Sequence, residues 1–350
     1  MVDIKSMSLS ELEARFDEIG QPGFRAKQVF KWLHRCVESF DEMTDLPVKL
    51  REQLSREFFI TVPQEANTQV SAQDGTIKYL WRLSDGNCVE TVVMSYRHGN
   101  TVCISTQVGC RMGCAFCAST IGGKVRDLTA AEMLDEVIFS EKQSGKQLSN
   151  IVLMGIGEPL DNFDNVLRFL ELINNKNGRN IGMRHISLST SGIIDKIDKL
   201  AGYDLQLTLS VSLHAPDDET RSRLMPINAS TGVDRLLKAC AAYFEKTGRR
   251  ISYEYAMIDG VNDSDGQAML LGKKLAHMSG AHVNLILLND VDGTGFKPST
   301  KDRVEQFKDI VESCGVTVTV RRRLGSDIDA SCGQLRRKVM NSQSLQTDRR

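Results

Sequence analysis

Long apolar segments and a charge excess of either sign are both missing from this sequence of 350 residues. No run approaches the roughly 20 apolar residues that a membrane helix needs, and the acidic, polar N-terminus lacks the apolar core of a secretory signal. We therefore expect a cytoplasmic protein with no membrane span. The net charge of −1 excludes a protein that is basic over its whole surface, but it is compatible with a local basic groove.

The chain is long enough to bury a sizeable core, either as one large α/β domain with additions or as two domains. Its nine cysteines are an odd number in a chain that we expect in the cytoplasm. Metal or redox chemistry is therefore favoured over a disulfide framework. No internal repeat or low-complexity domain is present.

Residues 1–60 are predicted to form a small helical accessory domain. The first helical pattern begins at an N-cap signal, Ser8, and stops at Gly20, and Pro47 stands close to the start of the third. A purely structural cap is the alternative to a domain that contacts an anionic partner. The basic residues available for such a contact are Arg25, Lys27, Lys31 and Arg35.

From residue 61 to 100 the pattern changes to an antiparallel β-meander with turns at DGN and HGN. Residues 101–322 then alternate short apolar strands with amphipathic helices. The expected strands are 102–107, 150–155, 184–190, 205–214, 251–257 and 282–288, with 316–321 as a further edge strand. Six strand–helix units predict the α/β class and a parallel sheet curled into a partial (βα)6 barrel, with its active site at the carboxyl ends of the strands. Residues 323–350 are expected to form a loop and a basic tail.

The segment CRMGCAFC directly follows the first barrel strand and contains Cys110, Cys114 and Cys117. Three thiolates within eight residues of one loop can surround a single metal centre. Zinc would need a fourth ligand from elsewhere. The candidates for that ligand are His98, His185 and His214. A [4Fe–4S] cluster with one iron open to substrate explains the missing ligand more directly.

The C-x3-C-x2-C spacing, with an aromatic residue before the last cysteine and a (βα)6 pattern behind it, resembles the radical S-adenosylmethionine (SAM) superfamily. In that superfamily the open iron binds SAM, and the reduced cluster cleaves SAM to methionine and a 5′-deoxyadenosyl radical. Further segments, in order between about residues 20 and 340, resemble the bacterial RNA adenine C(2)-methyltransferases. They are VETVVMSY, CISTQVGCRMGCAFCAST, MGIGEPLDN, SLSTSGI, SLHAP, MPIN, GVND and DIDASCGQL.

The segment MGIGEPL follows the second barrel strand. Taken alone, Gly155 and Gly157 would let the backbone approach a ligand and Glu158 would accept from an ammonium group, although a plain strand-to-helix turn explains the same letters. The resemblance implies that Gly157 and Glu158 hold the methionine end of SAM. It assigns the other SAM contacts to Ser189, Ser212, Leu213, His214 and Asn289, all at predicted strand ends.

Three further residues have ambiguous patterns on their own. Cys332 lies in a polar segment typical of an exposed, mobile thiol, whereas Cys103 lies on a strand, where cysteine is usually a small apolar residue. Glu90 interrupts an apolar strand, so it faces either solvent or a pocket in which desolvation would raise its pKa toward that of a useful base. The resemblance implies that all three are catalytic.

In the mechanism that the resemblance implies, a first SAM methylates Cys332 to S-methylcysteine. The radical from a second SAM removes a hydrogen from that methyl group, and the carbon radical adds to carbon 2 of adenine. Glu90 is then the proton acceptor, and Cys103 attacks the sulfur of Cys332 to form a transient disulfide that releases the methylated base.

The implied substrates are an adenine of 23S rRNA in the peptidyl-transferase centre and the adenine 3′ to the anticodon of some tRNAs. We also expect a flavodoxin-like or ferredoxin-like reductant, a monomer, and RNA contacts by the N-terminal domain. Candidate contacts to the RNA backbone are Arg321, Arg322, Arg323, Arg336, Arg337 and Lys338. The alternatives are an adenine carbon-8 rRNA methyltransferase that confers antibiotic resistance, another radical SAM reaction such as glycyl-radical activation or sulfur insertion, and a non-catalytic metal-binding module.

Overall fold

A ten-stranded sheet forms the body of the molecule in the computed structural model, which describes residues 1–288, 294–328, 333 and 335–336. The strand order is β14-β13-β12-β11-β10-β9-β6-β5-β4-β3. The parallel strands are β6 (Gly99–Cys103), β9 (Leu148–Leu153), β10 (Ile186–Thr190), β11 (Thr208–Ser212), β12 (Ile251–Met257), β13 (Ala281–Leu287) and β14 (Thr317–Val320). The antiparallel extension consists of β3 (Gln64–Val70), β4 (Ile77–Arg82) and β5 (Cys88–Tyr96).

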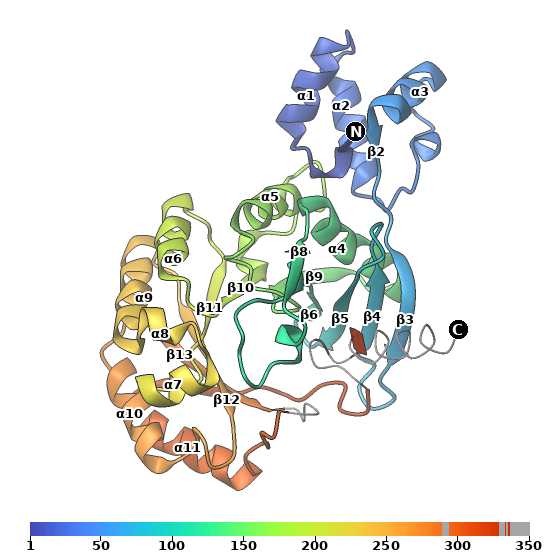
Figure 1. Cartoon of the computed structure of the whole chain (residues 1–350). Helices are drawn as coiled ribbons and strands as arrows, with labels where there is room; N and C mark the ends of the chain where they lie inside the picture. The colour runs from blue at the N-terminus through green and yellow to red at the C-terminus, as the bar shows by residue number, and fades with distance from the viewer. Residues whose placement is uncertain (289–293, 329–332, 334, 337–350) are drawn as a thin grey trace.

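Helices cover the outer face of the parallel strands (Figure 1). They are α4 (Ala130–Ser144), α5 (Phe163–Asn174), α6 (Ile194–Leu200), α9 (Val233–Thr247), α10 (Asp265–Leu275) and α11 (Lys301–Ser313), with the short α7 (Asp218–Leu224) and α8 (Asn228–Thr231) between β11 and α9. The curled sheet with helices outside confirms the expected partial (βα)6 barrel, and β14 is the expected additional edge strand.

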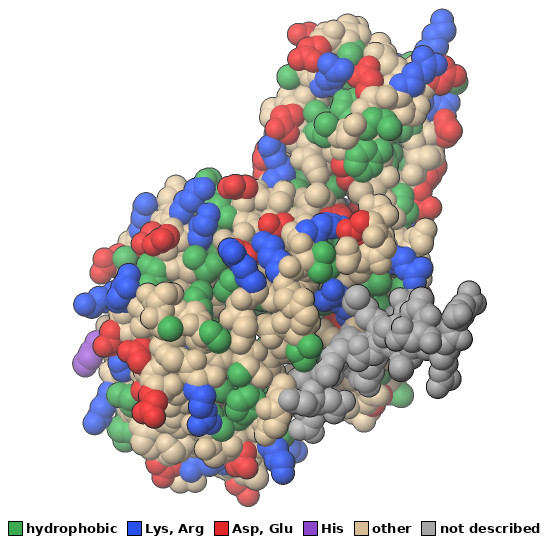
Figure 2. Space-filling view, in the orientation of Figure 1, with side chains coloured by type: hydrophobic (Ala, Val, Ile, Leu, Met, Phe, Trp, Pro, Cys, Tyr) green, Lys and Arg blue, Asp and Glu red, His purple; other side chains and the backbone are tan. Residues whose placement is uncertain are grey.

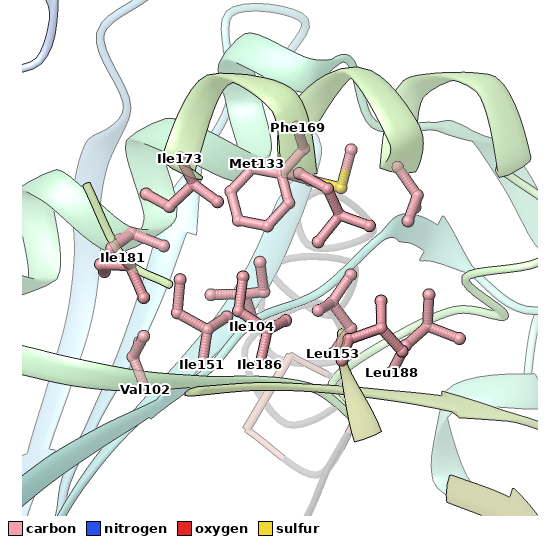
Figure 3. Packing of buried hydrophobic residues seen from close by; sticks show 14 of the residues in the cluster. Val102, Ile104, Met133, Ile151, Leu153, Phe169, Ile173, Ile181, Ile186 and Leu188 are labelled. Atoms are coloured by element: carbon pink, nitrogen blue, oxygen red, sulfur yellow. The ribbon is translucent and has the colours of Figure 1, made fainter. Parts of the chain in front are cut away.

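The core lies between the parallel strands and the helices that cover them. Figure 3 shows Met133 of α4 and Phe169 of α5 above side chains of β6, β9 and β10. The alternation in β10 explains this placement, because Ile186 and Leu188 are buried against the helices whereas Ser187 and Ser189 face the barrel interior. A strand of period two therefore gives the barrel an apolar outside and a polar inside.

Three short segments differ from the predictions. Strand β3 lies within the range expected for the meander but precedes the strands that its two turns connect. Its sequence, QEANTQV, is polar and mostly exposed, as suits the edge of a sheet. The first barrel strand ends at Cys103 rather than at residue 107. Just after Cys103, the backbone N–H of Ser105 donates to the carboxylate of the buried Glu136, at 3.0 Å, and not to a neighbouring strand. The chain then forms a small hairpin of β7 (Gln107–Gly109) and β8 (Lys124–Asp127).

Three helices at the N-terminus, α1 (Leu9–Glu18), α2 (Gly23–Leu33) and α3 (Val48–Glu57), project from the barrel (Figure 1). The strands β1 (Val2–Asp3) and β2 (Phe58–Phe59) pair at their base. A buried ion pair between Lys5 and Asp135 of α4 joins this part to the barrel. Figure 2 shows basic and acidic side chains interspersed on the face in view. The described ranges contain no helix with the length and apolar character needed to cross a membrane.

The described part of the C-terminal segment crosses from β14 to the turn between β3 and β4. The carboxylate of Asp327 accepts from the Ser71 hydroxyl at 2.6 Å and from the Ala72 N–H at 2.8 Å. Asp74 in turn accepts from the N–H of Gly325 at 2.8 Å. This segment therefore links the two edges of the sheet.

Candidate active site

A cavity of about 270 Å³ opens at the carboxyl ends of the barrel strands, under the loop that contains the three spaced cysteines. The predicted residues that line it are Cys110, Cys114, Cys117, Gly157, Glu158, Ser189, Ser212 and His214. Leu213 does not line it: this side chain is fully buried. Asn289 and Cys332 lie outside the described residues.

The thiols of the loop lie in an environment that favours their neutral form. Burial raises the pKa of Cys110 to about 12, and burial is also the main cause of the raised pKa of Cys114. A metal centre bound by these thiols would offset the cost of their burial as thiolates. An iron–sulfur cluster binds each thiolate through a different iron atom, so three thiols that line one cavity suit such a cluster.

The two glycines after β9 are needed for packing. A Cβ on Gly155 would lie 2.6 Å from the carbonyl oxygen of Ile104, and one on Gly157 would lie 2.7 Å from the Cβ of Gln107. On the side where a Cβ would stand, each glycine therefore packs against protein, and the approach of a ligand to their backbone stays a prediction. Their backbone still lines the cavity, and the positive φ of Gly157, 113°, turns the chain toward it.

Glu158 places a buried carboxylate in the cavity. Its oxygens accept from the backbone N–H of Ser191 at 2.7 Å and of Leu160 at 3.1 Å. Burial raises the pKa of this carboxyl, and the N–H of Ser191 opposes that rise. The two donors leave further lone pairs on the carboxylate that can accept from an ammonium group of a ligand.

His214 is a neutral hydrogen-bond donor whose ring is fixed. Its Nδ1 accepts from the N–H of Ala256 at 2.9 Å, so the proton of the neutral ring is on Nε2. Burial lowers the pKa of His214 to about 3. The ring packs edge-on against Phe116, with 4.9 Å between centroids, which ties the cluster loop to the end of β11.

Arg221 organises the strand ends, although no sequence pattern identifies it as a functional residue. This fully buried side chain of α7 donates to the carbonyl oxygens of Ser191 at 2.8 Å, Ser212 at 3.0 Å and Leu213 at 3.0 Å. Burial lowers its pKa only to about 10, so it stays charged at neutral pH. The carbonyl groups at the ends of β10 and β11 are thus held by one cation, and the role of Leu213 in the structure is that of an acceptor for it.

Glu90 faces a buried polar site on β5. The ammonium of the fully buried Lys78, on β4, lies 2.9 Å from Oε2 of Glu90. Lys78 could not be identified from the sequence because its partner is twelve positions away, across a hairpin. Strand register explains the contact: Lys78 is opposite Val92, and Leu80 is opposite Glu90, so the charged pair is diagonal on one face.

Cys103 lies on the same face. It ends β6 directly opposite Val92, which places it diagonal to Glu90, and residues at diagonal positions are about 7–8 Å apart. Cys103 is buried in an apolar cluster with Val92, Met94 and Met154. The structure therefore brings together two of the three residues predicted to be catalytic.

The residues around Cys332 also reach this face. The carboxylate of Glu90 accepts from the backbone N–H of Gly333 at 2.6 Å and from that of Arg336 at 2.6 Å. Leu335 is buried against Leu80 and Cys88. A Cβ on Gly333 would lie 2.8 Å from the backbone nitrogen of Ser119, just after the cluster loop. The residue that follows Cys332 therefore lies between Glu90 and the cluster loop.

The predicted basic region is only partly described. Arg321 lines the cavity, and Arg322 and Arg323 are exposed. Arg337 and Lys338 lie outside the described residues. The contact of this region with RNA stays a prediction.

Two family models match the chain. Residues 104–271 match the radical SAM superfamily, and residues 2–60 match the N-terminal domain of the ribosomal RNA large subunit methyltransferases. The chain is 50% identical over 341 residues to a probable dual-specificity RNA methyltransferase RlmN from Thermoanaerobacter pseudethanolicus, covering 97% of this chain and 99% of the relative. The protein of the same description from Alkaliphilus oremlandii is 49% identical, with the same coverage.

A solved structure agrees with these matches. The radical SAM methyltransferase from Sphaerobacter thermophilus has a TM-score of 0.90 and 41% sequence identity, covering 95% of this chain and 99% of that one. The thiols, the polar strand ends and the cavity fit the [4Fe–4S] cluster and the SAM that the superfamily uses. The chain belongs to the RlmN family of radical SAM, SAM-dependent RNA methyltransferases.

Proposed function

We propose that this protein transfers a methyl group from SAM to carbon 2 of an adenine in 23S rRNA, and of the adenine 3′ to the anticodon in some tRNAs. The dual-specificity description of its relatives supports these substrates. The structural observation that carries the proposal is the position of Gly333. This residue follows Cys332 and lies between the carboxylate of Glu90 and the cluster loop.

The chemistry of the target explains why such a site is needed. Carbon 2 of adenine is electron-poor and has no lone pair, so it cannot displace the methyl group of SAM. The cluster, when bound, supplies the electron that cleaves SAM to a hydrogen-abstracting radical. In the proposal Cys110, Cys114 and Cys117 hold that cluster, and Gly157, Glu158, Ser189, Ser212, Leu213, His214 and Asn289 contribute to the SAM site.

The remaining steps use side chains of this chain. The thiolate of Cys332 takes a methyl group from SAM. That group loses one hydrogen atom to the SAM-derived radical, and its carbon then bonds to carbon 2, while the Glu90 carboxylate accepts the proton of carbon 2. The Cys103 thiol then attacks the sulfur of Cys332: an S–S bond replaces the S–CH2 bond, and the electron pair of the broken bond takes the thiol proton to become a C–H bond of the new methyl group. A flavodoxin-like or ferredoxin-like partner reduces the disulfide and the cluster.

The shared face of β5 and β6 supports the division of roles. Glu90 and Cys103 are diagonal neighbours there, so one adenine held against this face meets both a base and a thiol. A cytoplasmic monomer that binds RNA through its N-terminal helices and through Arg322 and Arg323 completes the proposal.

Nucleoside mass spectrometry tests the reaction directly. The protein, reconstituted without oxygen, is incubated with SAM, a reductant and rRNA or tRNA. We expect 2-methyladenosine, and its formation identifies the substrate pool. Formation of 8-methyladenosine instead would assign the protein to the carbon-8 branch. Cleavage of SAM without any methylated adenosine would refute the RNA assignment.

A trapped intermediate tests the roles of the two cysteines. Cys103→Ala is expected to leave RNA bonded to the protein, because the attack that releases the base is lost. Cys314→Ala is the matched control, since Cys314 lies at the end of α11 and does not line the cavity at the strand ends. Absence of a crosslinked band in Cys103→Ala on a denaturing gel contradicts the disulfide step.

A further inference from the structure

A second cavity, of about 330 Å³, lies at the opposite end of the barrel, where the parallel strands begin. We call it the N-terminal mouth. It shares Met154, Glu254 and Arg321 with the candidate active site, so the two cavities adjoin inside the barrel. The proposed reaction uses only the first of them.

The N-terminal mouth is lined by an excess of positive charge. Arg184 precedes β10, Arg250 precedes β12 and Arg321 follows β14, and all three line the cavity. Arg184 and Arg250 are exposed, and neither pairs with a carboxylate among the described residues. The one acidic lining residue, Glu254, is buried and accepts from Asn284 at 2.7 Å and from Ser252 at 2.9 Å. The hydroxyl and amide groups of the lining would be sufficient for a cavity that holds only water. Two guanidinium groups without a carboxylate partner are instead suited to binding phosphates.

A pair of stacked rings lies on the rim of this mouth. The rings of Tyr96 and His98 are 5.2 Å apart, with an interplanar angle of 15°, and both residues line the cavity. Tyr96 is partly buried and His98 is exposed. Aromatic rings beside arginines are the usual platform for unstacked RNA bases.

The platform is on the face of β5 that leads to the catalytic side chains. Residues Glu90, Val92, Met94 and Tyr96 alternate onto one face of this strand. Tyr96 packs on the cluster of Met94 and Cys103. Tyr96 is four residues from Val92, about 14 Å along the strand, and Val92 is the position opposite Cys103.

We propose that the N-terminal mouth binds the RNA strand next to the target adenine. Phosphates bind Arg184 and Arg250, the neighbouring base stacks on His98, and the target adenine reaches along β5 to Glu90 and Cys103. This inference rests on the proposed function, since it needs an RNA substrate. It adds a binding site for the flanking nucleotides at the end of the barrel remote from the cluster loop.

Salt-dependent binding of a synthetic RNA stem-loop, with adenine 3′ to the anticodon, tests the proposal in the full-length, cluster-loaded protein. The double variant Arg184→Ala/Arg250→Ala is compared with Lys238→Ala/Lys246→Ala, which removes two exposed charges from the outer helix α9. For two lost phosphate contacts, the slope of log Kd against log salt falls by about 1.4, and affinity at 0.1 M salt falls by roughly 25-fold. The control pair is expected to change neither.

His98→Ala tests the platform separately. Loss of a stacked base lowers affinity by at least about five-fold and leaves the salt slope unchanged. If the wild-type protein methylates the stem-loop while the arginine pair behaves like the lysine pair, the N-terminal mouth does not bind RNA and the inference is overturned. If the wild-type protein neither binds nor methylates rRNA and tRNA, the proposed function falls, and this inference with it.

Discussion

Replacing Lys78 by Met tests whether its buried ammonium group stabilises the Glu90 carboxylate. Lys78 is fully buried, Glu90 is 2% exposed, and their charged atoms are 2.9 Å apart. Met keeps an unbranched apolar chain of similar length and removes the charge. Because the loss of one partner leaves a buried charge uncompensated, we expect the free energy of unfolding to fall by about 3–5 kcal/mol.

The assay is denaturant unfolding of the cluster-loaded protein without oxygen, followed by circular dichroism. The matched control is Lys78→Met/Glu90→Gln, which removes both charges and keeps an amide oxygen that can accept an N–H. Exchanging both members of a buried pair for neutral groups is often close to neutral. We therefore expect the double variant to regain most of the lost stability, and the cycle of four proteins gives the coupling energy between the two side chains.

Two results would refute this reasoning. One is a loss of less than about 1 kcal/mol in Lys78→Met, which is the range of an exposed ion pair. The other is additivity, in which the double variant loses the sum of the two single losses. Either result would mean that the ammonium does not stabilise the Glu90 carboxylate in the folded protein.

Three other changes have expected outcomes. Arg221→Met leaves the carbonyl oxygens of Leu213, Ser191 and Ser212 without this donor. Each buried carbonyl without a donor costs about 1–3 kcal/mol of stability, so we expect thermal unfolding at a lower temperature and, by calorimetry, weaker binding of SAM. Glu90→Ala removes the acceptor of the Arg336 N–H, so trypsin is expected to cut after Arg336 faster than in the wild-type protein. Burial lowers the pKa of His34 to about 4. Between pH 6.5 and 4 only the unfolded chain binds this proton, so the free energy of unfolding falls as the pH falls. His34→Asn is expected to reduce the slope of the free energy of unfolding against pH by about 1.4 kcal/mol per pH unit, as measured in denaturant titrations.

The sequence was sufficient to predict the barrel because its signals are local. Segments such as ISLST alternate apolar and polar residues, and each is followed by an amphipathic pattern of helical length. The cysteines of the cluster loop could be found in the same way, since three ligands lie within eight residues. That they line one cavity with Glu158 and His214 follows from strand ends meeting at one edge of a parallel sheet.

Buried charges could not be predicted, because their partners are distant or belong to the backbone. In the sequence, Lys78 is indistinguishable from an ordinary polar residue on a strand. Only the register of β4 and β5 shows that it lies beside Glu90. Arg221 reads as one of several charges on a short helix, and its acceptors are carbonyl groups that no side-chain pattern reveals. The end of β6 at Cys103 depends likewise on Glu136, which lies more than thirty positions further along the chain.

Glu90 connects the proposed chemistry to the position of the C-terminal segment. A carboxylate has about four acceptor sites, and among the described residues three donors use them: Lys78 and the N–H of Gly333 on Oε2, and the N–H of Arg336 on Oε1. In the proposed reaction, the proton of carbon 2 goes to the acceptor site that these three donors leave on Oε1, beside the bond to Arg336. The proposed proton transfer and the anchoring of the segment thus use the same carboxylate. Because Gly333 is bounded by Ser119 on its other side, a shift of the segment away from Glu90 also changes its contact with the cluster loop. In the proposed reaction, methyl transfer to Cys332, proton removal and release of the base are therefore expected to depend on one and the same docking of Gly333, Leu335 and Arg336.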